Sequence, residues 1–163
     1  MTSTLQPGFE CEYAFDGDVT SWKGWAYDGN VPASIVLNFE TPVSMNAVAF
    51  KNAVGRAQYH IIRDFSIDVL IGGVFLAVSG VKANDSPNIN GNRIAFGDNY
   101  EDVMISFDTK LDVTAFRITV YSTSHSENNG ILTEVYALDV EDTNTFVSQD
   151  LDSVIKSLDE GKT

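Results

Sequence analysis

The feature that most constrains this chain is the alternation of polar and apolar residues over short segments. Segment 64–69 (DFSIDV) alternates strictly, and Phe116, Ile118 and Val120 repeat the pattern with polar residues between them. A period of two places the apolar side chains on one face of a β-strand. Further strands are predicted over 34–39, 46–50, 74–78, 103–107 and 133–140, with a turn at 40–42.

Turn dipeptides separate these predicted strands. They are Asp28-Gly29, Gly72-Gly73, Asn90-Gly91 and Asn129-Gly130. Many short strands with no helical pattern between them predict an all-β, antiparallel sandwich. No repeat of 20–50 residues is visible, which argues against a solenoid or a propeller.

The end of the chain has a different pattern. Six apolar residues fall near helical spacing: Phe146, Val147, Leu151, Val154, Ile155 and Leu158. We therefore expect a β-sandwich over 1–140 and an acidic C-terminal helix or linker over 141–163. The apolar stripe is expected to pack on the sandwich or on a neighbouring domain rather than to bind a ligand.

Length and charge limit the function classes. A chain of 163 residues can bury a sizeable core by itself. The net charge of -13 weighs against nucleic acid and anionic membranes as partners. Cys11 is the only cysteine, so no intramolecular disulfide can form. The first residues lack a secretory-signal pattern, which leaves open another export route, a removed signal or a longer chain.

A group of oxygen ligands stands near the start of the sequence. Asp16 and Asp18 flank a glycine, and Thr20 adds a hydroxyl and a carbonyl. Calcium prefers six to eight such oxygens, so distant residues would have to complete a shell here. An ordinary Asp-Gly turn accounts for the same local spacing equally well.

The order of several segments resembles the discoidin, or coagulation-factor type C, domain and the related family 32 carbohydrate-binding modules. The segments that carry this resemblance are 14–22 (AFDGDVTSW), 32–39 (PASIVLNF), 43–50, 62–69, 115–120 and 130–135 (GILTEV). Together they cover roughly residues 10–140. The resemblance implies a galactose-binding-like jelly-roll fold, which agrees with the predicted strands.

The resemblance also implies a structural Ca²⁺ that ties the first loop to the last strand. Carried over by position, its ligands would be Tyr13, Asp16, Asp18, Thr20, Thr133 and Glu134. The loop between Asp18 and Thr20 is one residue shorter than in many relatives, so Ser21 is an alternative to Thr20. The disulfide that clamps the ends of the coagulation-factor branch is missing.

Sugars are recognised by aromatic rings and by planar polar groups. Trp25 and Tyr27 are candidates for a sugar platform, with packing onto the sandwich edge as the equal alternative, whereas Trp22 matches a core position. In sugar-binding relatives an arginine in the loop after the second strand contacts the ligand, which points to Arg56. The other candidate ligand-binding residues are Asn52, Tyr59, His60, His125 and Asn128. A lone histidine contacts a ligand less often than it occurs without such a role, and this applies to both histidines here. The histidine and paired arginines of the F-type fucose lectins have no match here.

No catalytic motif stands out, so we expect no enzyme. The leading hypothesis is a non-catalytic, calcium-stabilised carbohydrate-binding module that attaches a larger protein or particle to glycans, with a neutral, galactose-type sugar as partner. The alternatives are a protein- or phospholipid-binding discoidin adhesion module and a structural virion or matrix component. The expected location is extracellular or on a cell or particle surface, and the sequon at Asn84 adds slightly to that expectation.

Overall fold

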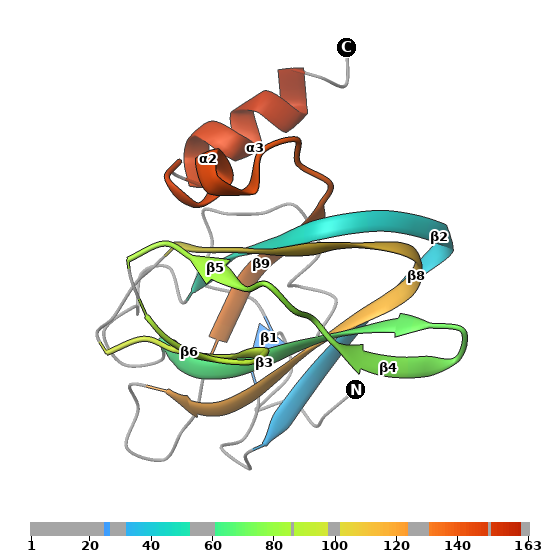
Figure 1. Cartoon of the computed structure of the whole chain (residues 1–163). Helices are drawn as coiled ribbons and strands as arrows, with labels where there is room; N and C mark the ends of the chain where they lie inside the picture. The colour runs from blue at the N-terminus through green and yellow to red at the C-terminus, as the bar shows by residue number, and fades with distance from the viewer. Residues whose placement is uncertain are drawn as a thin grey trace.

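Two long strands organise the fold. In the computed structural model, β2 (Ala33–Asn52) and β8 (Asp102–Thr123) pair antiparallel from one end to the other. Both strands bend near their middle and turn back, so each contributes to both layers of a sandwich (Figure 1). The structure describes residues 25–26, 32–52, 61–85, 87–97, 102–123, 131–149 and 151–160.

The bends lie where the pairing register shifts. The shifts fall between Asn38 and Ala47, and Pro42 sits inside the first of them, where a missing backbone N–H costs no ladder bond. On β8, Asp112 has a φ of 56°, a left-handed conformation that aspartate tolerates better than most residues. The sequence prediction of a turn at 40–42 between separate strands was therefore wrong, because β2 continues through this segment as an irregular strand.

The remaining strands flank this pair, and all pairings are antiparallel. In the first layer, β3 (Ile62–Ile71) pairs with β8, β4 (Val74–Ala77) and β7 (Arg93–Ala95), and β6 (Asn88–Asn90) pairs with β7. In the second layer, β9 (Ile131–Leu138) pairs with β2 and with β1 (Trp25–Ala26), and β5 (Lys82–Ala83) pairs with β8. The predicted all-β antiparallel sandwich is confirmed.

Glycine turns connect two of these strand pairs. Gly72 and Gly73 have φ values of 60° and 80° between β3 and β4, and Gly91 has a φ of 61° between β6 and β7. Such values suit the two-residue turns of β-hairpins. The turn at Gly72-Gly73 is confirmed, and the turn predicted at Asn90-Gly91 lies one residue later because Asn90 still belongs to β6. The other two predicted turns lie outside the described residues.

Alternation along the strands builds the core between the layers. Phe65, Ile67 and Val69 of β3 and Phe116 and Ile118 of β8 are all buried, as the period of two predicts. The rings of Phe50 and Phe65 meet edge to face with centroids 5.1 Å apart, which joins the second layer to the first.

Helices cover the outer face of the second layer. α2 (Thr143–Val147) and α3 (Leu151–Glu160) lie over β2, β8 and β9 in Figure 1. Phe146 and Leu151 pack there in a second buried cluster with Ala47, Ala49 and Met104. Two alanines on this face leave room for the helices to approach the strands closely.

Polar contacts fix the chain where it enters α2. The side-chain amide of Asn46 donates to the Val140 carbonyl and accepts from the Val140 N–H, both at 2.8 Å. Asp142 caps the helix by accepting from the backbone N–H groups of Asn144 and Thr145. Hydrogen bonds from the Thr145 hydroxyl and from these N–H groups lower the pKa of Asp142. These contacts fix the start of α2 on the sandwich, while the domain boundary at residue 140 stays a prediction.

Within the described chain, neither helix has the length and apolar character needed to cross a bilayer.

Replacing Phe146 tests whether this docking stabilises the whole protein. Phe146→Ala removes a ring that is 3% exposed and is expected to lower the free energy of unfolding by about 3 kcal/mol, measured by urea denaturation. Val74→Ala, at a side chain that is 58% exposed, is the control and should change the free energy of unfolding by less than about 0.5 kcal/mol. Equal effects of both substitutions would contradict the docking.

Candidate functional site

Three strands of the second layer bring candidate residues together at one end of the sandwich. Leu132 of β9 lies opposite Trp25 of β1 on one side and opposite Asn52 of β2 on the other. Since neighbouring strands lie about 4.8 Å apart, the backbones of Trp25 and Asn52 are roughly 10 Å apart.

The described strand ends that flank four connections between the two layers lie at this same end. The described strands that bound segments 27–31, 53–60, 98–101 and 124–130 have these ends opposite the bends of β2 and β8 (Figure 1). The candidate residues of segments 53–60 and 124–130 therefore belong to connections that start from one end. Such clustered connections on a rigid sandwich are a common place for binding residues.

Most of the predicted site residues lie outside the described residues. These are Tyr13, Asp16, Asp18, Thr20, Tyr27, Arg56, Tyr59, His60, His125 and Asn128. Trp25, Asn52 and Thr133 are placed by their backbones alone. Their assignments as sugar or metal ligands stay predictions.

Glu134 is the one predicted metal ligand whose side chain is described. It is 3% exposed and lies on β9 directly opposite Lys51 of β2. Its carboxylate and the adjacent Thr133 carbonyl are the hard oxygen donors that Ca²⁺ prefers. Among the described residues, no group of three His, Cys, Asp or Glu side chains converges on a point. A cation at Glu134 would therefore need further oxygens from the segments outside them.

A row of charges crosses three neighbouring strands at this end. Lys51 of β2 lies opposite Asp102 of β8 on one side and opposite Glu134 on the other. The Lys51 Nζ donates to the Asp102 Oδ1 at 2.7 Å and lies 3.3 Å from the Asp152 Oδ1 on α3. The sequence analysis missed this row, although a lysine directly after the apolar run 47–50 was a visible signal.

The two aspartates decide the electrostatics of Lys51. Burial lowers the pKa of this ammonium group, but the hydrogen bonds and charges of Asp102 and Asp152 outweigh it, so the net pKa is raised. A charged ammonium beside Glu134 would repel a bound cation. Because two carboxylates balance it, the row remains compatible with a cation at Glu134.

The outer face of the first layer carries a second polar network. Arg93 forms a bidentate pair with Asp64 and lies 4.0 Å over the ring of Tyr121. Arg117 pairs with Asp68 and lies 4.1 Å over the ring of Phe75. Each arginine thus has a carboxylate and an aromatic partner within the protein, so the charged residues of this face are accounted for by contacts within the fold.

Asn84, the acceptor of the sequon, is engaged in the fold. Its Nδ2 donates to the Asp102 carbonyl and to the Asp85 Oδ2, both at 2.9 Å, and its Oδ1 accepts from the Met104 N–H. A glycan on Nδ2 would remove one of these bonds, so the sequon gives no support to an extracellular location.

Comparison of the sequence with protein-family models and with curated proteins gave no match. Solved structures do match in fold. The family 32 carbohydrate-binding module of Clostridium perfringens NanJ, in complex with galactose, has a TM-score of 0.63 at 15% identity, over 81% of this chain and 86% of that module. The F5/8 type C domain of a Bacteroides fragilis protein has a TM-score of 0.60 at 14% identity, over 82% of each chain.

A larger chain matches as well. The structure named SpGH29 has a TM-score of 0.63 at 15% identity, over 86% of this chain but only 26% of its own length. The resemblance to family 32 modules and type C domains is thus confirmed at the level of the galactose-binding-like fold.

Two aspartate substitutions test the Lys51 row. Asp102→Asn removes a partner that is 30% exposed and 2.7 Å away, and is expected to cost about 2 kcal/mol of unfolding free energy. Asp152→Asn removes a carboxylate partner of Lys51 that is 76% exposed, and should lower the free energy of unfolding by about 0.5 kcal/mol.

The pH dependence of the same variants supplies a control. A raised lysine pKa contributes stability that is present below its unfolded pKa and lost as pH rises through the folded pKa. The difference between the native protein and Asp102→Asn, followed by urea denaturation, should therefore shrink above about pH 10.4. A difference that stays constant through this range would show that Lys51 is not the partner that matters.

Proposed function

We propose that this chain is a non-catalytic carbohydrate-binding module that recognises a neutral, galactose-type glycan. The observation that carries the proposal is the register of β1, β9 and β2, which brings Trp25 and Asn52 to opposite sides of Leu132 at the end where the connections converge. The fold supports it, because solved modules of this fold include one in complex with galactose.

The proposed site combines aromatic rings with polar side chains. Trp25, with Tyr27, offers an aromatic surface for the C–H face of a sugar ring. Arg56 and Asn52 would bind neighbouring hydroxyl groups through paired hydrogen bonds, with Tyr59, His60, His125 and Asn128 around them. None of these roles requires a reacting group, which agrees with a binding module rather than an enzyme.

We further propose a structural Ca²⁺ next to this site. Glu134 and the carbonyl of Thr133 would hold it from β9, and Asp16, Asp18, Thr20 and the carbonyl of Tyr13 from the N-terminal segment. The ion would supply a cross-link between the two ends of the domain. The buried carboxylate of Glu134 supports this assignment.

The biological role follows from these two proposals. A module of this kind, as part of a larger extracellular or surface protein, would raise the local concentration of that protein near glycans. Discoidin adhesion modules for protein or phospholipid and structural virion or matrix components share the fold and are the alternatives. A net charge of -13 disfavours the phospholipid alternative.

Sugar binding is tested by a glycan array followed by calorimetric titration with the best galactose-type ligand. Trp25→Ala and Arg56→Ala are each expected to weaken binding by about tenfold or more, since a few aromatic and arginine contacts carry most binding energy. The melting temperature should hardly change. Leu111→Ala, at an exposed position on the bend of β8, is the control and should leave binding intact.

An array without glycan binding would exclude the proposal. Binding that survives both substitutions would move the site away from the converging connections.

The metal is tested separately by melting curves with Ca²⁺ and with EDTA. A ligand at one hundred times its Kd stabilises the folded state by about 2.7 kcal/mol, so EDTA should lower the melting temperature. Asp16→Ala and Glu134→Gln should abolish the difference, whereas Glu40→Gln, an exposed carboxylate on the β2 bend, should preserve it. Identical curves with Ca²⁺ and EDTA would refute the metal site and leave the sugar site standing.

A further inference from the structure

A groove lies between the end of β9 and the two helices. It has a volume of about 570 Å³, and an adjoining hollow of about 240 Å³ shares Val140, Glu141, Phe146 and Gln149 with it. The two hollows follow the chain from the last residues of β9 through the start of α2. Their lining residues belong to the end of β9, to the segment that follows it, to both helices and to the residues just after α2.

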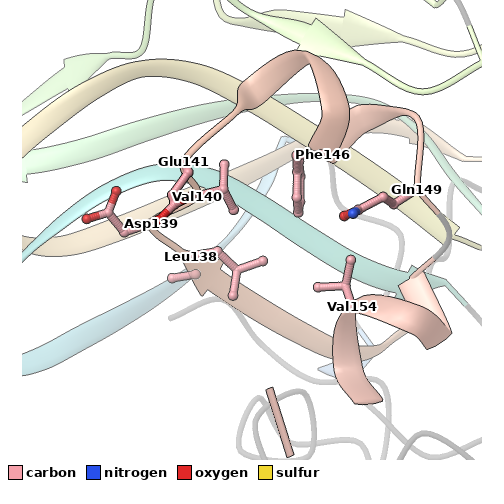
Figure 2. A pocket seen from close by; sticks show the side chains of 8 residues that line it. Leu138, Asp139, Val140, Glu141, Phe146, Gln149 and Val154 are labelled. Carbon is pink, nitrogen blue, oxygen red and sulfur yellow. The ribbon is translucent and has the colours of Figure 1, made fainter. Parts of the chain in front are cut away.

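The walls of the groove are apolar. Leu138, Val140, Phe146 and Val154 point toward its middle, and the amide of Gln149 reaches in from one side (Figure 2). Leu138, Val140 and Val154 are only partly buried although they belong to the second hydrophobic cluster. An apolar side chain placed here would therefore remove exposed apolar surface from water.

The edge of the groove is acidic. Asp139 and Glu141 line the larger hollow, and Asp142 lines the smaller one. Among the described residues that line the two hollows, Lys, Arg and His do not occur. Asp142 is occupied in capping α2, whereas neither Asp139 nor Glu141 forms an ion pair with a described residue.

We propose that this groove binds a segment of a partner protein in which an apolar side chain is flanked by lysine or arginine. The apolar side chain would fill the space between Phe146 and Val154, and the cations would pair with Asp139 and Glu141. Backbone groups of the segment would find a donor and an acceptor in the Gln149 amide. The acidic edge selects against anionic segments, including most of the surface of a second copy of this chain.

The groove is separate from the proposed sugar site. Trp25 and Asn52 flank β9 near its start, whereas Leu138 ends it, which is about 20 Å away along the strand. Both could be occupied at once. The inference therefore stands whether or not the chain binds a glycan.

The experiment titrates the ¹⁵N-labelled full chain with a synthetic peptide that has a leucine–phenylalanine pair between lysine pairs. Two matched peptides carry glutamate in place of lysine, or serine in place of the apolar pair. We expect amide shifts at Val140, Phe146 and Gln149 with the first peptide, and at least about tenfold weaker binding of the other two.

Matched variants separate the groove from general charge attraction. Asp139→Asn with Glu141→Gln should weaken the lysine peptide by about tenfold. Glu40→Gln with Asp112→Asn removes the same charge from the strand bends, and asparagine suits the positive φ of Asp112. This control should leave the affinity within about twofold.

Several outcomes would overturn the proposal. Equal weakening by both pairs of substitutions, or shifts spread over the whole surface, would mean non-specific attraction to an acidic protein. Equal binding of the glutamate peptide would show that the charges of the groove do not select the partner. Equal binding of the serine peptide would show that the apolar contact does not contribute to binding. Groove shifts that depend on protein concentration without peptide would assign the groove to a second copy of the chain.

Discussion

The antiparallel pairing of β2 with β8 is the interaction on which the rest of the structure depends. It runs from Ala33 opposite Val120 to Lys51 opposite Asp102, and its register shifts let both strands cross from one layer to the other. One pairing thus sets the relative position of the layers, because the same two strands lie in each. It also sets where the connections converge, since the bends fix which strand ends lie together.

The two outer faces of the sandwich differ in polarity, because different residue types alternate with the core residues along their strands. On the first layer these positions are charged or hydroxylated, and Asp64, Asp68, Arg93 and Arg117 pair with one another across strands. On the second layer they include Ala47, Ala49 and Met104, which need a cover. The helices supply it, so the composition of β2 and β8 on this face accounts for the apolar side chains of Phe146 and Leu151.

The sequence predicted what depends on local pattern and missed what depends on how distant segments meet. Alternation located the strands, and glycine-containing dipeptides located two hairpin turns. In the sequence, Pro42 predicted the end of a strand. The register shift that accommodates this proline within β2 arises from the pairing with β8, which the sequence does not show. The row of Asp102, Lys51 and Glu134 joins residues from three strands, so the sequence could show that Lys51 is unusual but could not identify its partners. The same holds for the groove, whose walls depend on how α2 and α3 settle on β9.

The position of β9 separates the candidate sugar site from the groove. Its first residues lie between Trp25 and Asn52, and its last residues form the groove with Phe146 and Val154. The Lys51 contact with Asp152 ties α3 to the strand end that carries the candidate sugar site. This contact is more exposed than the Lys51 pair with Asp102, so Lys51 keeps its shorter carboxylate contact if α3 moves. A partner in the groove is therefore expected to leave sugar affinity almost unchanged, which is the behaviour required of a module that joins a glycan to a second protein.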